Sequence, residues 1–154
     1  DVKRAYFYAP AKRTVYVKLP EEDNESGMCG KLRMSMYGTR DAAQNWEEEY
    51  TAFLTELGFT RGLSSPCLFR HSKRDTDVVV HGDDFIFCGL DEYWKWIAKL
   101  MKGWFEIKVR AILGEGQDDD KEVVVLGRTA MWTREGITYE ADPKHRQKVL
   151  DHFG

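Results

Sequence analysis

The sequence predicts an α+β fold in which helices cover one face of an antiparallel sheet. Three observations lead to this prediction. Short β-branched and aromatic runs recur along the chain, two longer segments repeat apolar residues every three or four positions, and the last segment opens with a helix-start signal. The order is strands, helix, hairpin, helix and strand, followed by a small C-terminal hairpin and helix. This order is close to the split βαβ, or ferredoxin-like, arrangement.

The first forty residues predict extended segments separated by turns. Pro10 and Pro20 each end an apolar or alternating run, and a second alternating run ends near Gly38. In chain order, the predicted segments are an apolar stretch at 1–8, a strand at 14–19, an acidic loop at 21–27 and a strand at 31–36.

Three helices are predicted from apolar spacing and end signals. The first follows Asp41 and stops at Gly58, and the second is capped by Asp91. The third begins with Asp142 as its N-cap and Pro143 at its first position, and it runs to Phe153. The apolar faces of the first two consist of Ala43, Trp46, Tyr50, Phe53, Leu54 and Leu57, and of Tyr93, Trp94, Ile97, Leu100 and Met101.

The centre of the chain predicts a hairpin with acids at its tip. Val78–Val80 and Phe85–Cys88 are short apolar strands, and Gly82 between them suits a tight turn. Asp83 and Asp84 then stand side by side at the tip. Adjacent carboxylates repel each other, and a divalent cation relieves that repulsion. An ordinary solvated turn is the alternative interpretation.

The remaining segments are short strands and loops. They are a strand at 66–69, a polar turn at 70–77, a strand at 105–110, a loop at 114–121, and strands at 123–126 and 137–139 on either side of a turn at 135–136.

Composition limits the class of protein. At 154 residues, with 42% hydrophobic and 32% charged residues, the chain is predicted to form one domain with a real core. It carries no secretion signal and no apolar run of bilayer length, so we expect an intracellular location without membrane partners, in a cytoplasmic particle or the nucleus. Cys29, Cys67 and Cys88 are interpreted as small apolar fillers in a reducing compartment.

The charge distribution is uneven. A net charge of −3 argues against binding nucleic acid through charge alone. A local basic groove stays open as an interpretation, with a solvated basic face as its alternative. The first quarter is basic through Lys3, Arg4, Lys12, Arg13, Lys18, Lys31, Arg33 and Arg40.

An ordered set of short motifs carries a family resemblance over nearly the full length. Together the motifs resemble the reverse transcriptase domain of copia-type LTR retrotransposons. They are Asp1-Val-Lys-Arg-Ala-Tyr6, Val15-Tyr16-Val17-Lys18, Ser35-Met-Tyr37-Gly38, Trp46, Leu57-Gly58-Phe59, Pro66-Cys67-Leu68-Phe69, the Asp83-Asp84 hairpin, Phe105-Glu106-Ile107-Lys108, Leu126-Gly127 and Phe153-Gly154.

The resemblance implies a polymerase palm that performs two-metal nucleotidyl transfer. Asp1, Asp83 and Asp84, with the carbonyl of Val2, would hold two Mg²⁺ ions, for which Mn²⁺ could substitute. Two metals roughly 4 Å apart can serve the attacking and leaving oxygens of phosphoryl transfer. The implied partners are an RNA or DNA template with a DNA primer, deoxynucleoside triphosphates and the remainder of a Pol polyprotein.

The resemblance also implies a nucleotide site. Tyr6 falls where the family has an aromatic under the sugar, which favours deoxynucleotides; a core aromatic is the alternative, and RNA-dependent RNA polymerases would place a second Asp there. Arg40 keeps the charge of the family's Lys. Asp41 replaces the family's Gln and brings an unfavourable charge beside a triphosphate.

Two further contacts are implied at the primer and the leaving group. His81 and Gly82 replace the family's usual Tyr-Val and would contact the primer end, and Lys108 would donate a proton to departing pyrophosphate. A polar strand histidine and a solvated lysine are the alternatives.

The domain prediction is a single palm fragment spanning 1–154, without the upstream fingers segment and most of the thumb, and inactive by itself. Two other functions stay open. One is a catalytically inactive retroelement-derived scaffold that binds nucleic acid or protein. The other is an RNA-binding sheet that presents Tyr6, Tyr8 and Tyr16 for base stacking.

Overall fold

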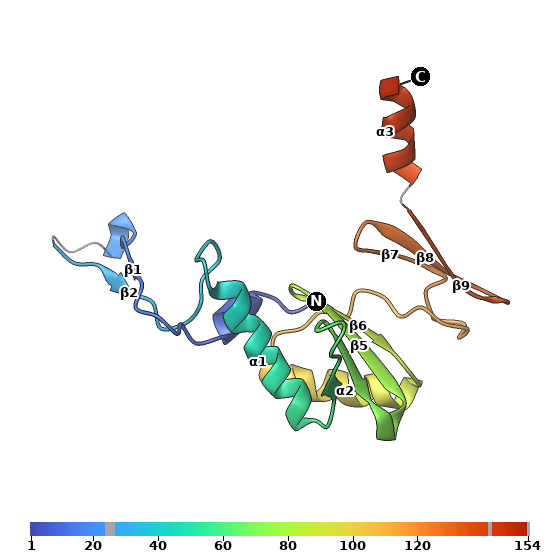
Figure 1. Ribbon diagram of the computed structural model, residues 1–154, viewed down its shortest axis with the longest axis horizontal. Coiled ribbons are helices and arrows are strands. Elements are labelled where there is room, and N and C mark those ends of the chain that lie inside the picture. Colours follow the sequence, from blue (N-terminus) through green and yellow to red (C-terminus); the bar gives the residue numbers. More distant parts are fainter. Residues whose placement is uncertain (24–26, 142, 154) are drawn as a thin grey trace. The chain divides into compact units, whose positions relative to one another are not determined.

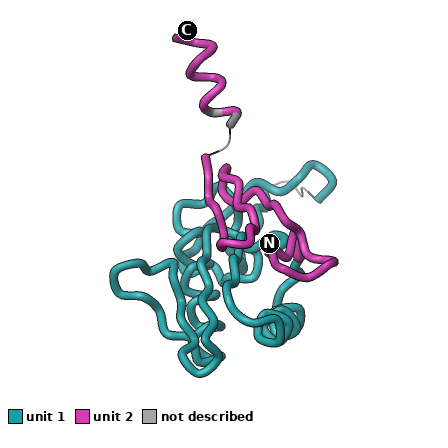
Figure 2. Tube along the Cα trace, turned by 90° about the vertical axis from the view of Figure 1, so that its right-hand side faces the viewer, with its two compact units in different colours: residues 1–108 teal, residues 109–154 magenta. Residues whose placement is uncertain are grey.

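The computed structural model describes residues 1–23, 27–141 and 143–153. The chain divides into two compact units, residues 1–108 and 109–154, coloured separately in Figure 2. The fold class is α+β, as predicted, with three antiparallel sheets and three α-helices in the described ranges. The predicted helix cap at Asp142 lies outside these ranges.

The central sheet of the first unit has four antiparallel strands in chain order (Figure 1). They are β3 (Thr60–Arg61), β4 (Leu68–His71), β5 (Thr76–His81) and β6 (Asp84–Cys88). The predicted hairpin is confirmed as β5 and β6. The predicted polar turn at 70–77 is too long, because β4 continues through His71 and pairs it with Thr76. A short 3-10 helix, η3 (Ser72–Arg74), closes this turn.

Helices α1 (Ala42–Glu56) and α2 (Asp91–Trp104) confirm the first two helix predictions. Gly58 ends α1 in the predicted way: with φ +94 it donates to the Thr55 carbonyl while Phe59 donates to that of Leu54. This pair of bonds is a Schellman motif, which needs a left-handed residue at this position. The predicted cap at Asp91 is wrong by one residue, because Leu90 is the N-cap and Asp91 lies in the first turn.

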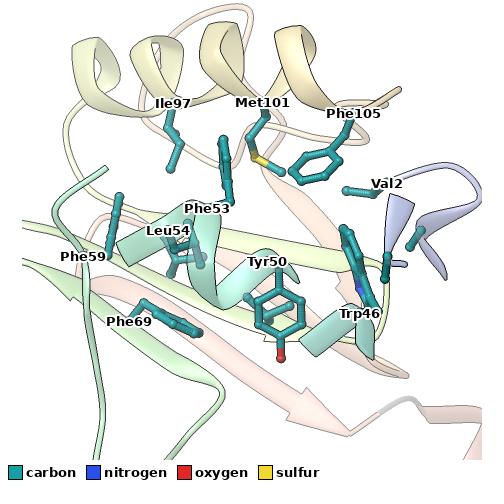
Figure 3. Close-up of a cluster of buried hydrophobic side chains, with 14 residues drawn as sticks. Val2, Trp46, Tyr50, Phe53, Leu54, Phe59, Phe69, Ile97, Met101 and Phe105 are labelled. Carbon is teal, nitrogen blue, oxygen red and sulfur yellow. The ribbon is translucent and has the colours of Figure 1, made fainter. Parts of the chain in front are cut away.

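The core of the first unit lies between both helices and one face of the sheet (Figure 3). Residues paired directly across antiparallel strands share a face, so Phe69, Val78 and Phe87 point to the same side. This face carries the buried cluster, which confirms that the helices cover one face. The cluster consists of Val2, Ala5, Ala9, Trp46, Tyr50, Phe53, Leu54, Phe59, Phe69, Val78, Val80, Ile97, Met101 and Phe105.

The strand prediction at 105–110 is wrong. Ile107 forms only an isolated antiparallel bridge, to Val2. The partner segment cannot continue, because Arg4 takes a left-handed φ of 54 and the chain turns into the 3-10 helix η1 (Ala5–Tyr8). An alternating pattern shows which face would be buried but does not provide a neighbour of matching length.

The strand predicted at 14–19 is shortened to β1 (Tyr16–Val17). The strand predicted at 31–36 is wrong, because the partner of β1 in the sheet is β2 (Gly30–Lys31), which shares only Lys31 with it, and an isolated bridge joins Pro10 to Met34. A further 3-10 helix, η2 (Glu21–Asp23), lies within the predicted acidic loop. Of the tyrosines suggested for base stacking, Tyr16 is on a strand, whereas Tyr6 and Tyr8 are in η1.

The second unit is a three-stranded sheet followed by a helix, where a two-stranded hairpin and helix are predicted. Its elements are β7 (Glu122–Val125), β8 (Arg128–Thr133), β9 (Gly136–Ala141) and α3 (Pro143–Phe153). Sequence reasoning misses β8 because the turn before it, Leu126-Gly127, carries only one residue of typical turn chemistry. Both residues nevertheless have positive φ, 50 and 72, as a two-residue type I′ turn requires.

Two further predictions concern the surface. Cys29, Cys67 and Cys88 are all exposed, so their interpretation as small apolar fillers is wrong. None of the described helices is long and apolar enough to cross a bilayer. The split βαβ palm arrangement stays a prediction.

Candidate active site

The predicted metal-binding acids lie at the tip of the β5–β6 hairpin. His81 pairs with Asp84, so Gly82 and Asp83 form a two-residue loop. Gly82 takes a φ of +62, and Asp83 does not share this positive φ, a pattern typical of a type II′ turn. His81, Gly82 and Asp83 are exposed, and Asp84 is partly buried. The side chains of His81 and Asp83 are therefore open to solvent.

Two donors from other elements bind the carbonyls of this turn. The indole Nε1 of Trp46, on α1, donates to the Gly82 carbonyl over 2.8 Å. The amide of Val2 donates to the Asp83 carbonyl, also over 2.8 Å. Figure 3 shows Val2 and Trp46 at the same end of the core cluster. The backbone carrying Asp1 is thereby held next to the backbone carrying Asp83, although the two are far apart in sequence.

The other edge of residues 1–3 pairs with residues 106–108. The backbone amide of Lys3 donates to the Glu106 carbonyl over 2.8 Å, and the backbone amide of Lys108 donates to the Asp1 carbonyl over 2.9 Å. The backbone nitrogen of Asp1 donates in return to the Lys108 carbonyl over 3.2 Å. Residues 1–3 thus lie between the hairpin turn and residues 106–108. This brings four sequence-predicted positions, Asp1, Val2, Asp83 and Lys108, into one backbone network.

The donor atoms here suit a hard cation, because Asp1, Asp83, Asp84 and the Val2 carbonyl offer only oxygen ligands. The carboxylates themselves are not assembled. Across the described ranges, no group of three or more His, Cys, Asp or Glu side chains is arranged to hold a metal ion. The backbone contact between Val2 and Asp83 is present, whereas convergence of the three carboxylates is not.

The predicted nucleotide-site residues Arg40 and Asp41 line a surface hollow of about 270 Å³ with Arg13 and Gln44. The Asp41 carboxylate accepts from Arg13 Nε at 2.9 Å and from Asn45 Nδ2 at 3.5 Å. The hydrogen bond from Arg13 holds the pKa of Asp41 below its ordinary value. The charge that was expected to oppose a triphosphate is therefore paired with a guanidinium.

Further polar contacts join the start of α1 to the segment that contains Arg13. Asn45 is buried and also donates to Ser35 Oγ at 3.0 Å, while the Ser35 amide donates to the Ala9 carbonyl at 2.7 Å. Lys12 forms an ion pair with Glu48 on α1. The start of α1 is therefore joined to residues 9–13 by polar contacts as well as by packing.

Tyr6, predicted to lie under the nucleotide sugar, stacks on Tyr37. Their ring centroids are 4.3 Å apart and the ring planes are inclined by 24°. Phe7 meets the other aromatic of the pair, Tyr37, edge-on at 5.7 Å. Tyr6 is partly buried against the core, and Tyr37 is exposed. The partial burial of Tyr6 fits the core alternative, and its role under the nucleotide sugar stays a prediction.

Sequence reasoning misses the roles of Arg13 and Trp46. The helical period places Trp46 on an apolar face, which says nothing about where its N–H points. An acid at the start of α1 signals the need for a counter-charge, but the basic first quarter offers many candidates besides Arg13. Only the folded structure selects among them.

Comparison with known proteins agrees with the resemblance. The family described as "Reverse transcriptase (RNA-dependent DNA polymerase)" matches residues 1–115. This chain belongs to that family.

Curated relatives extend the match. The chain is 26% identical to a retrovirus-related Pol polyprotein from the transposon TNT 1-94 of Nicotiana tabacum, over 99% of the chain and 11% of the relative. It is 26% identical to the transposon Ty1-DR1 Gag-Pol polyprotein of Saccharomyces cerevisiae, over 87% of the chain and 8% of the relative. No solved structure matches. The copia-type resemblance is confirmed, and the chain spans about a tenth of the length of these relatives.

Proposed function

We propose that this chain forms the palm of an RNA-directed DNA polymerase and carries its nucleotidyl-transfer centre. The observation that carries the proposal is the hydrogen bond from the Val2 amide to the Asp83 carbonyl, 2.8 Å long. In this family the first acid of the opening motif and the hairpin acids serve together. Family membership supplies the expectation, and this contact supports it by joining the two segments.

Asp1, Asp83 and Asp84, with the Val2 carbonyl, would hold the metal ions. When bound, Mg²⁺, with Mn²⁺ as a substitute, would supply charge neutralisation at the reacting phosphate and would lower the pKa of the attacking hydroxyl. The exposed turn leaves the Asp83 side chain free of core packing, so it can rotate toward Asp1. Convergence of the carboxylates is then part of metal binding itself.

The hollow beside α1 would receive the triphosphate. Arg40 supplies a cation there, and Arg13 neutralises Asp41, so the net charge of these three side chains is positive. Tyr6 would lie under the deoxyribose, where its ring excludes a 2′-hydroxyl. His81 at the hairpin tip would contact the primer end, and Lys108, next to Asp1 in the backbone network, would protonate pyrophosphate. The template, the primer and the remainder of Pol are the proposed partners.

A binding titration tests the metal centre directly. We expect the chain to bind Mn²⁺, followed by electron paramagnetic resonance, and Asp83→Asn to weaken binding by more than the 10–100-fold typical when only the partner of a metal ligand is changed. Asp23→Asn, which alters an exposed acid in η2, is the matched control. Equal Mn²⁺ affinity in the wild type and Asp83→Asn would refute the assignment.

A primer-extension assay tests the activity. The polyprotein that contains the wild-type chain is compared with the same polyprotein carrying Asp83→Asn. Each is supplied with RNA template, DNA primer and deoxynucleotides. We expect the substitution to abolish Mg²⁺-dependent extension and Asp23→Asn to preserve it.

A further inference from the structure

The turn between β5 and β6 is more constrained than a hairpin tip ordinarily is. In a two-residue loop, the carbonyls of both central residues lie outside the β5–β6 ladder and normally bind water. Here both carbonyls accept hydrogen bonds from protein donors: that of Gly82 from the Trp46 indole, and that of Asp83 from the Val2 amide. Hairpin tips with few contacts open at low free-energy cost. These two bonds oppose such opening.

Trp46 is well suited to hold the turn, because its ring cannot easily move. It is only 1% exposed. Its ring meets those of Phe85 at 6.3 Å and Phe105 at 5.3 Å, inclined by 71° and 83°. Such edge-to-face contacts fix the plane of the indole and hence the direction of its N–H.

The neighbours of Trp46 also belong to the site. Phe85 follows Asp84 on β6, and Phe105 precedes the residues that pair with Asp1 and Lys3. One side chain from α1 therefore contacts the hairpin turn, the first ring of β6 and the segment that supports residues 1–3.

We propose that Trp46 is a positioning residue, whose indole N–H holds the Gly82–Asp83 turn in register with the Val2 amide. The link to metal binding rests on the proposed function. The tether itself does not, because it concerns the free protein. Trp46 is not a ligand and touches no reacting atom; it acts through the backbone of the turn.

An isosteric replacement tests the tether without creating a cavity. Benzothienylalanine at Trp46 replaces the indole N–H by sulfur and keeps the ring. The matched control is the same replacement at Trp94 on α2, whose buried Nε1 has no hydrogen-bond partner among the described residues. Both proteins undergo the same chemical change, and only the first loses a hydrogen bond.

The readout is amide hydrogen exchange at Val2 in the full chain without metal. Loss of one buried hydrogen bond corresponds to roughly a two- to tenfold change in a local equilibrium. We expect exchange at the Val2 amide to speed up by about that factor when Trp46 is replaced and to stay unchanged when Trp94 is replaced. The Val78 amide in β5 serves as an internal reference. Equal exchange at Val2 in both replaced proteins would overturn the proposal.

A second measurement separates this proposal from the proposed function. Mn²⁺ affinity, measured where all proteins remain folded, should fall by a similar factor at position 46 and stay constant at position 94, whereas general destabilisation would affect both. If the wild type binds no Mn²⁺ while replacement of Trp46 still speeds exchange at the Val2 amide, the metal assignment fails and the tether stands.

Discussion

Gly82→Ala tests whether the hairpin turn depends on backbone conformation. An added Cβ at Gly82 would meet no heavy atom within 4 Å in the described part of the chain, so the substitution causes no steric overlap. The cost comes from the φ of +62, which L residues rarely adopt. A sparsely populated backbone conformation of this kind costs an L residue about 1–3 kcal/mol. We expect Gly82→Ala to lower the free energy of unfolding of the first unit by about that amount.

Gly103→Ala is the matched control, because it adds the same methyl group to open space. Gly103 lies in α2, and its added Cβ also meets nothing within 4 Å. Its backbone is helical, where alanine is preferred over glycine by about 0.5–1 kcal/mol. We therefore expect Gly103→Ala to stabilise the protein. The two substitutions should differ by about 1.5–4 kcal/mol and have opposite signs.

Urea unfolding followed by tryptophan fluorescence measures both changes, because four of the five tryptophans, including buried Trp46, lie in the first unit. A shared m-value would show that the unfolded states are comparable. If Gly82→Ala were neutral or stabilising while Gly103→Ala behaved as expected, the turn would not require its positive φ. The type II′ assignment would then be wrong.

Three further predictions concern charge and packing. Arg13 lowers the pKa of Asp41, so this pair stabilises the fold at pH values above the ordinary carboxyl pKa. The contribution is lost as the pH falls through the lowered pKa. Arg13→Gln should return the Asp41 pKa toward its ordinary value in a carboxyl NMR titration. The pKa of Glu106 is lowered first by Lys3, so Lys3→Gln should raise it in the same titration, and an unchanged value would contradict the 2.6 Å ion pair. Phe69→Ala, at a fully buried ring, should cost about 3–5 kcal/mol in urea unfolding; a loss below about 1 kcal/mol would mean that the sheet does not pack as described.

The sequence predicted elements well where local pattern determines structure. The helix that ends at Gly58 and the hairpin around Gly82 follow from periodicity and from residues that tolerate positive φ. Strand length was predicted poorly at 105–110, because a strand also requires a partner. That partner ends where Arg4 turns the chain, and no local pattern near Ile107 contains this information.

The site shows the same division. The family resemblance implied that Asp1 and Asp83 act together, which stays a prediction. The hydrogen bond that joins their segments comes from the amide of Val2, a residue proposed only for its carbonyl. The hydrogen bond from Trp46 could not be predicted for a related reason. A tryptophan at this position of α1 is explained by the apolar face alone, so the sequence does not show that its N–H also binds the Gly82 carbonyl. Long-range hydrogen bonds to main-chain atoms leave little trace in residue types, because any residue can provide them.

Asp41 shows why a departure from a family motif is not by itself a sign of decay. Considered alone, a carboxylate in place of an amide beside Arg40 opposes the binding of a triphosphate. In the structure Arg13 donates a hydrogen bond of 2.9 Å to that carboxylate. The neighbouring residue, Lys12, forms an ion pair with Glu48 on α1, so the segment that carries Arg13 is also attached to this helix. An exposed ion pair contributes little to stability, but it cancels a charge at the place where the charge would oppose a ligand. The consequence of a substitution for function therefore depends on the neighbour that the fold supplies, which the motif does not contain.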